Sequence, residues 1–159
     1  MNIKTILHQA SKTLSNFSIA SAQLESEILL SEVIQKDRRY LILNANEELK
    51  KENIQSFNYL VKRRKKGEPI AYLIKKKEFW AQNFYINQNV LIPRPDTEHL
   101  VEETLRLFNV NSKLSILDIG TGSGCILLSI LKERRNFYGT GIDISKKAIN
   151  VACFNAKIH

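Results

Sequence analysis

The chain has few of the residues that interrupt regular structure. It contains three prolines and six glycines in 159 residues, and neither type occurs before Gly67. Proline and glycine are the strongest breaks in regular structure, so their scarcity here predicts helices over the first part of the chain. Residues 1–66 also carry apolar side chains at helical spacing. This pattern indicates a small bundle of amphipathic helices.

Cysteine and long hydrophobic runs are also scarce. Cys125 and Cys153 have no metal-ligand spacing and lie among apolar neighbours, so we expect two buried thiols and no metal site. No apolar run approaches the ~20 residues that a membrane-spanning helix requires. The segment Met1–His8 is amphipathic and lacks the apolar core of a signal peptide. We therefore expect a cytoplasmic protein that does not contact a membrane.

Positive charge, in contrast, is in excess. The formal net charge is +8, and the basic residues concentrate in Lys62–Lys66 and Lys75–Lys77. Such runs can attract nucleic acid, a ribosome or an acidic protein. They can equally be solvated cations that complement the dipole at a helix end. No aromatic residue interleaves with the first run, which counts against binding to single-stranded nucleic acid.

The first strong break lies at Gly67–Pro69. Residues 78–92 are rich in aromatic and β-branched side chains around the turn-prone Asn87–Asn89, which predicts a β-hairpin. Pro93 and Pro95 end this segment, and a helix is expected after them.

The remainder alternates between strand and helix. Ser115–Ile119 and Phe137–Ile144 are predicted strands, and a helix over Cys125–Leu131 lies between them. Ser145 can cap a last helix. This alternation predicts an α/β arrangement in which the two strands are parallel and joined by a crossover helix.

The turn after the first of these strands is the most informative segment. Leu117–Gly124 places glycine at alternate positions of the turn, so that a ligand can lie against bare backbone. The helix that follows directs its N-terminal N–H groups and its dipole toward that turn. Asp143 ends the second strand, where an acid in a nucleotide-binding βαβ unit accepts hydrogen bonds from ribose. These features indicate an adenosine-type ligand.

The spacing of the turn selects among such ligands. The dinucleotide fingerprint requires glycine at the position of Cys125, which disfavours NAD. Asp118 either holds the turn through backbone N–H groups or faces a cationic group of the ligand, and a carboxylate there would repel pyrophosphate. S-adenosylmethionine is therefore the predicted cofactor, and a glycine turn without a ligand is the remaining alternative. The predicted cofactor-binding residues are Asp118, Gly120, Thr121, Gly122, Ser123, Gly124 and Asp143.

Four segments together resemble a known family. They are Gly67–Tyr72, Glu78–Trp80, Leu91–Glu98 and the glycine turn, and they look like the HemK/PrmC family of release factor glutamine methyltransferases. The resemblance covers the whole chain, and the sequence Ile-Pro-Arg-Pro-Asp-Thr-Glu is its most specific part.

The resemblance implies a fold and an activity. Residues 1–72 would form a helical domain that helps to hold the protein substrate, 73–95 a hairpin linker, and 96–159 the first half of a Rossmann-like class I methyltransferase domain. The family transfers a methyl group from S-adenosylmethionine to the glutamine amide of the Gly-Gly-Gln motif in class-one release factors. Gly120–Gly124 and Asp143 match its cofactor loop and ribose acid, and Arg94–Glu98 match a segment near the cofactor.

The chain also departs from the family pattern. Lys75 and Ala81 stand where the family has glycine, and the family's Asn-Pro-Pro-Tyr motif, which holds the glutamine amide, does not occur. We therefore assign no catalytic residue and expect a truncated enzyme that is catalytically incomplete by itself.

Two alternatives remain. The first is a binding module without catalytic activity that contacts release factor or ribosome. The second is a related methyltransferase acting on amino groups of nucleic acid, against which the segment Pro93–Glu98 argues.

Overall fold

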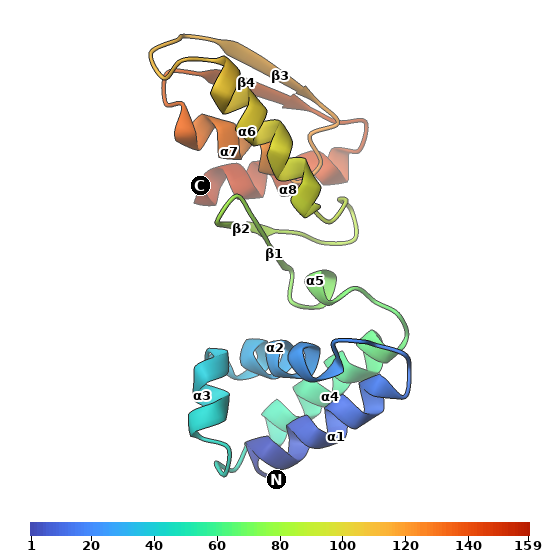
Figure 1. Cartoon of the computed structure of the whole chain (residues 1–159). Helices are drawn as coiled ribbons and strands as arrows, with labels where there is room; N and C mark the ends of the chain where they lie inside the picture. The colour runs from blue at the N-terminus through green and yellow to red at the C-terminus, as the bar shows by residue number, and fades with distance from the viewer. The chain divides into compact units, whose positions relative to one another are not determined.

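The computed structural model describes all residues, 1–159, and they form two compact units, Met1–Ile74 and Lys75–His159. Figure 1 labels the helices and strands of both units. The first unit is entirely helical. Its helices are α1 (Ile3–Ser15), α2 (Ala22–Ile34), α3 (Arg38–Leu43), α4 (Lys51–Lys65) and α5 (Ile70–Leu73).

Helices α1, α2 and α4 pack against one another around a common core. Asn2 caps α1 by accepting the N–H of Thr5 at 2.9 Å. Apolar residues then recur along one face of α1, and this face is buried together with the fully buried ring of Phe57 on α4. The buried residues of α1 are Ile3, Ile6, Ala10 and Leu14.

The second unit combines strands and helices. Its elements are β1 (Lys76–Phe79), β2 (Gln82–Tyr85), a 3-10 turn (Pro95–Thr97), α6 (Glu98–Leu107), β3 (Ser115–Ile119), α7 (Cys125–Glu133), β4 (Tyr138–Ile142) and α8 (Lys146–Ile158). Strands β3 and β4 are parallel, with Asp118 opposite Gly141, and α7 is the crossover between them. The helical bundle followed by an α/β unit confirms the predicted fold class. The predicted three-part division at residues 72 and 95 stays a prediction.

The turn of the hairpin lies at a different position from the predicted one. Strands β1 and β2 are antiparallel, and they turn at Trp80 and Ala81 instead of at Asn87–Asn89. Both turn residues have a φ of +51°, as a two-residue hairpin turn with the twist of its strands requires. The predicted turn position was wrong because Trp-Ala lacks the glycine or asparagine that normally marks such a turn.

Helices cover one face of the β3–β4 sheet. Helices α7 and α8 pack on that face, and α6 packs against α7 (Figure 1). Side chains of the opposite face are exposed, and Ile119 is 75% accessible. The core of this unit is therefore one-sided. It contains Phe79, Phe84, Val101, Ile130 and Phe137.

The two cysteines differ in environment. Cys125 is buried at the start of α7, and burial raises the pKa of its thiol. Cys153 is exposed, so the expectation of two buried thiols was wrong for this residue. Cys153 borders an open pocket that residues of α7 such as Leu127 and Leu131 also line, so its surroundings are apolar although it is exposed. None of the helices combines the length and the apolarity that crossing a membrane would require.

Candidate cofactor site

The loop between β3 and α7 has a backbone that only glycine adopts readily. Gly120, Gly122 and Gly124 have φ angles of +81°, +55° and +80°. These values lie in the left-handed region, where a Cβ atom crowds the carbonyl that follows it at a cost of about 1–2 kcal/mol. The path of the loop itself therefore favours glycine at these three positions.

Backbone hydrogen bonds fix this loop to the neighbouring strand. The N–H groups of Gly120 and Thr121 both donate to the carbonyl of Ile142, at 2.8 and 2.9 Å. The N–H of Gly124 donates to the carbonyl of Thr121 at 2.8 Å. These three N–H groups therefore hold the loop itself, and the expectation that the N-terminal N–H groups of α7 face a ligand stays a prediction.

Asp143 joins the loop to the end of β4. Its Oδ2 accepts the N–H of Gly122 at 2.9 Å, and its Oδ1 accepts the N–H of Ser145 at 2.8 Å. The N–H bonds from Ser145 and then Gly122 hold the pKa of the Asp143 carboxyl below its usual range. A carboxylate offers about four acceptor positions, so this half-buried group retains acceptor capacity.

Asp118 lies near the end of β3, opposite Gly141 of β4. Its Oδ2 accepts the hydroxyl of the buried Thr121 at 2.7 Å. Thr121 in turn faces Gly141 of β4, where a Cβ atom would lie 2.9 Å from the threonine hydroxyl. Gly141 therefore belongs to the site, although sequence reasoning missed it. A glycine inside a strand was the available signal, because it often marks a close approach.

The last part of the loop packs against α8. A Cβ atom on Gly124 would lie 3.1 Å from a methyl carbon of Leu128 and 3.4 Å from the Cβ of Ala152. The preceding carbonyl, of Ser123, accepts the side-chain N–H of the buried Asn155 at 2.8 Å. Asn155 was also missed, because an asparagine inside an amphipathic helix carries no local signal of its distant partners.

The segment Pro93–Glu98 contacts the turn of the hairpin. Glu98 accepts the backbone N–H of Trp80 at 2.9 Å, which stabilises the strained turn between β1 and β2. Arg94 is exposed. The structure thus gives Glu98 a contact that is structural, while the predicted proximity of this segment to a cofactor stays a prediction.

The basic run of α4 is partly neutralised within the helical unit. Arg63 donates to Glu68 at 2.7 Å, and Arg64 forms an ion pair with Glu25. The remaining cations of the run are exposed, and these are Lys62, Lys65 and Lys66.

Aromatic rings lie beside these cations in space. The Nζ of Lys65 is 4.4 Å from the ring centroid of Phe17, which is 48% exposed. The guanidinium of Arg63 lies 5.5 Å from the ring centroid of Tyr59. The sequence pattern showed no such interleaving, because Phe17 lies on a distant turn and Tyr59 is one helical turn before Arg63.

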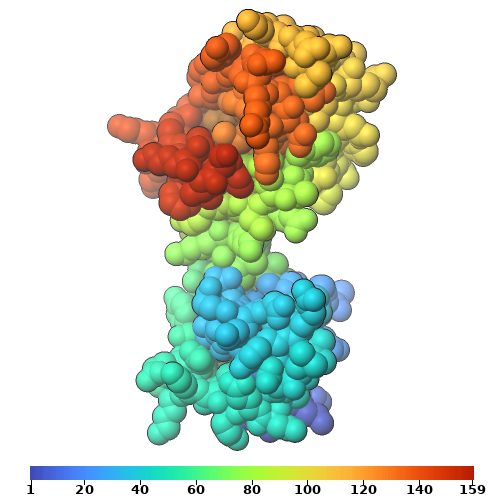
Figure 2. All heavy atoms as spheres, turned by 90° about the vertical axis from the view of Figure 1, so that its left-hand side faces the viewer, coloured from blue at the N-terminus to red at the C-terminus, as the bar shows by residue number.

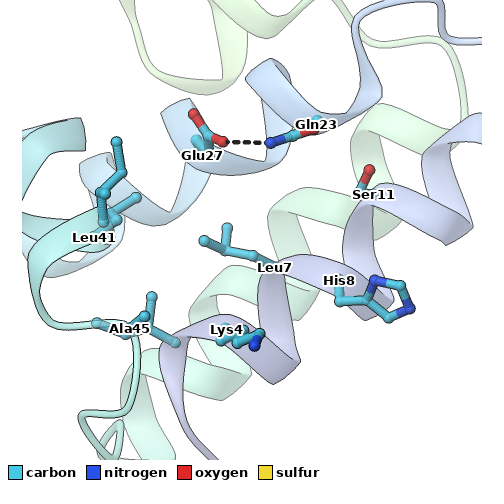
Figure 3. Close-up of a pocket in the computed structure, with 10 residues that line it drawn as sticks. Lys4, Leu7, His8, Ser11, Gln23, Glu27, Leu41 and Ala45 are labelled. Atoms are coloured by element: carbon cyan, nitrogen blue, oxygen red, sulfur yellow. Dashed lines mark hydrogen bonds between the residues drawn. The ribbon is translucent and has the colours of Figure 1, made fainter.

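A groove also opens between α1, α2 and α3 (Figure 3). Its volume is about 290 Å³, and Leu7 and Leu41 provide apolar lining. The carboxylate of Glu27 accepts a hydrogen bond from Gln23 at 3.2 Å and another from Arg38 at 2.9 Å. The acid in this groove is therefore engaged by its neighbours.

Comparison with known proteins adds an independent line of evidence. Residues 5–74 match the family described as the PrmC N-terminal domain. The release factor glutamine methyltransferase of Buchnera aphidicola subsp. Baizongia pistaciae is 44% identical over 158 residues, which cover 99% of this chain and 57% of that protein. The protein of the same name from Coxiella burnetii is 40% identical over 159 residues, 100% of this chain and 57% of that protein.

A second group of relatives is longer. The bifunctional methyltransferase of Rickettsia felis is 40% identical over 182 residues, which cover 98% of this chain and 34% of that protein. The chain spans about half the length of the release factor glutamine methyltransferases that it matches. Its helical unit matches the PrmC N-terminal domain, and the similarity to release factor glutamine methyltransferases continues through its second unit to His159, so the whole chain is similar to part of the proteins of the HemK/PrmC family.

Proposed function

We propose that the loop between β3 and α7, with Asp118 and Asp143, binds S-adenosylmethionine. The observation that carries this proposal is that the backbone donors of the loop are bonded within the protein, whereas carboxylate acceptors remain available to a ligand. The N–H groups of Gly120, Thr121, Gly122 and Gly124 are bonded within the protein. A pyrophosphate is bound mainly through backbone N–H groups, and because these four are already engaged, the turn itself offers a dinucleotide few donors.

The acceptors of the site suit a ligand that is rich in donors. Asp143 would accept ribose hydroxyls with the acceptor positions that Gly122 and Ser145 leave unused. Asp118, whose carboxylate has one intramolecular donor, Thr121, would face the cationic amino acid portion. S-adenosylmethionine carries both kinds of group, and when bound it supplies an electrophilic methyl group.

The shape of the loop also fits a ligand. A Cβ atom built on Gly120 would meet nothing within 4 Å, and one on Gly122 would meet only a backbone oxygen at 3.9 Å. The backbone on this side of the loop therefore borders open space, into which a side chain would project. Bare backbone is the surface that a flat adenosine can approach closely.

We further propose that the reaction served by this site is methylation of the glutamine amide in the Gly-Gly-Gln motif of class-one release factors. The names of the relatives from Buchnera and Coxiella support this assignment. The helical unit, Met1–Ile74, would help to hold the release factor.

An amide nitrogen is a weak nucleophile, and its methylation needs groups that orient it and stabilise the charge that develops. We assign none of residues 1–159 to that role. The 159-residue chain is therefore expected to bind the cofactor without transferring its methyl group, as a binding module would. Incubation with labelled S-adenosylmethionine and a class-one release factor tests this, and label in the release factor would contradict it.

Calorimetry tests the cofactor assignment. We expect S-adenosylmethionine to bind the chain and NAD not to bind. Asp143→Ala should weaken binding by about tenfold or more, because it removes both a ligand acceptor and the anchor of Gly122. Glu102→Gln, an exposed change on α6, is the control and should leave the affinity unchanged. Equal affinities in all three proteins would contradict the assigned site.

A second candidate function is contact with single-stranded RNA, such as exposed RNA of a ribosome. Lys65 over Phe17 and Arg63 over Tyr59 favour it, because single-strand sites combine cations that meet phosphates with rings on which bases stack. The substitution of Lys62, Lys65 and Lys66 by glutamine should weaken binding of a labelled oligouridylate.

The salt dependence identifies the cause of that loss. Each lost phosphate contact should reduce the slope of log affinity against log salt by roughly 0.7. Substituting Lys50 and Lys51, at the opposite end of α4, provides the control. An unchanged slope in the triple variant would exclude this surface as an RNA site.

A further inference from the structure

The side chain of Asn155 connects two segments that are far apart in the sequence. The residue lies on α8 and is fully buried. Its Nδ2 donates to the carbonyl of Tyr85 at 2.9 Å and to the carbonyl of Ser123 at 2.8 Å. Its Oδ1 accepts the N–H of Tyr85 at 2.8 Å. One amide therefore joins the end of β2 to the glycine loop.

The chemistry of these contacts requires asparagine. The side-chain amide has two N–H donors and one carbonyl acceptor, and each of them has a protein partner here. An aspartate at this position would direct a carboxylate at the carbonyls of Tyr85 and Ser123, which are acceptors only. A leucine would leave three backbone groups without partners in a site from which water is excluded.

The bond to Ser123 fixes a peptide plane of the cofactor loop. The carbonyl of Ser123 and the N–H of Gly124 belong to the same rigid peptide unit. The side chain of Asn155 donates to the carbonyl of this unit. The N–H of the same unit, from Gly124, donates to the carbonyl of Thr121 at 2.8 Å. Thr121 in turn donates its hydroxyl to Asp118. A continuous series of hydrogen bonds thus runs from α8 through the loop to the carboxylate.

Other contacts between α8 and the hairpin do not reach the loop. The ring of Phe154 packs edge-on against the ring of Tyr85 at 4.9 Å, and the ring of His159 lies 4.6 Å from that of Phe84. The C-terminal helix (red) lies directly against the hairpin segment (light green) in the space-filling view (Figure 2). Asn155 alone among these residues contacts both the hairpin and the loop.

We infer that Asn155 is a positioning residue that couples the conformation of the cofactor loop to the docking of the β1–β2 hairpin. Order in the loop then stabilises the hairpin contact at Tyr85, and by reciprocity a well-docked hairpin favours the loop conformation that binds ligand. The part of this inference that concerns ligand affinity rests on the proposed cofactor site. The coupling of loop and hairpin is a property of the protein by itself.

The first test needs no ligand. Amide hydrogen exchange is measured at Gly124 and Tyr85 in the unmodified chain, in Asn155→Asp and in Phe154→Ala. We expect Asn155→Asp to speed exchange at both amides by about tenfold or more, because a carboxylate loses the two donated bonds and repels the carbonyls of Tyr85 and Ser123, although it can still accept the Tyr85 N–H. Phe154→Ala should speed exchange at Tyr85 and leave Gly124 unchanged. Equal acceleration at Gly124 in the two variants would overturn the coupling, since it would mean only a general loss of stability.

The second test uses S-adenosylmethionine. Binding should slow exchange at Tyr85 in the unmodified chain and in Phe154→Ala, and this effect should be lost in Asn155→Asp together with about tenfold or more of the affinity. If the unmodified chain binds no cofactor, the proposed function fails while the ligand-free comparison still decides the coupling. If Asn155→Asp does not fold, Asn155→Ser replaces it, since serine keeps one donor in a smaller side chain. An unchanged Gly124 exchange in that variant would overturn the inference.

Discussion

The Oδ2 atom of Asp143 accepts the backbone N–H of Gly122 at 2.9 Å, across the gap between the end of β4 and the glycine loop. The bond joins an acid and a glycine that the sequence separates but the parallel strands bring together. The carboxylate of Asp143 anchors the loop, and in the proposed function the same carboxylate also accepts the ribose hydroxyls, so Asp143 would have two roles. Substitutions at this position should therefore affect both the free protein and its complex.

Asparagine at position 143 separates these tasks. Asp143→Asn keeps an acceptor for Gly122 or for Ser145 but has one carbonyl oxygen instead of two carboxylate oxygens. We expect a smaller loss of cofactor affinity than in Asp143→Ala, and a smaller change in the amide chemical shift of Gly122. Equal losses in the two variants would mean that the charge of the carboxylate, and not its hydrogen bonding, dominates.

The ionisation of Asp143 should be shifted to low pH. The N–H donors of Ser145 and Gly122 favour the carboxylate, so its pKa in the folded protein lies below that of the unfolded chain. Stability from these bonds is then fully present above the unfolded pKa, about 3.9, and is lost as the pH falls through the lower folded value. The carboxyl carbon shift of Asp143, followed by NMR, should titrate below about 3.9. A midpoint at or above that value would contradict the assigned bonds.

Two glycines of the loop should respond differently to alanine. Both Gly120 and Gly124 have a left-handed backbone, and alanine there costs about 1–2 kcal/mol of strain. A Cβ on Gly124 also meets Leu128 at 3.1 Å, whereas one on Gly120 meets nothing within 4 Å. Denaturant unfolding should therefore show a larger loss for Gly124→Ala.

For cofactor affinity we expect the reverse order, with the larger loss in Gly120→Ala. The Cβ of Gly120→Ala projects into the open space assigned to the cofactor, so this variant should lose affinity beyond its loss of stability. Unchanged binding by Gly120→Ala would indicate that the ligand does not lie against this part of the backbone.

The helical unit contains an ion pair that should contribute to its stability. Arg64 and Glu25 are largely buried, with side chains 18% and 12% exposed. Arg64→Gln should cost about 1–3 kcal/mol, because it leaves a carboxylate with weaker partners. Arg106→Gln removes the exposed pair with Glu103 and should have no measurable effect. Thermal unfolding of the two variants measures the difference, and equal transitions would show that burial does not strengthen the Arg64 pair.

Features that depend on local chemistry were predicted from the sequence. The strand Ser115–Ile119 has the predicted bounds, and Ser145 caps α8 by accepting the N–H of Ala148. The turn that the alternating glycines predicted after this strand is also present, and its glycines have positive φ angles. In each case the residues that predict the feature lie within a few positions of it, because capping and turn preferences are local.

Features that depend on distant partners were not predicted. The hairpin turn at Trp80 and Ala81 is stabilised by Glu98, and the residues of the turn do not themselves indicate that this distant partner is present. Asn155 acquires its partners only when α8 packs on the hairpin and the loop. Local patterns cannot report such contacts, because tertiary packing determines which distant groups meet.

Calorimetric titration of the 159-residue chain with S-adenosylmethionine tests the central claim most directly, with Gly120→Ala and Asp143→Ala measured beside it. The account predicts one saturable site per chain, weakened by about tenfold or more in Asp143→Ala. NAD in the same titration should give no binding heat. Absence of binding by a folded chain, or binding that both substitutions leave unchanged, would contradict it.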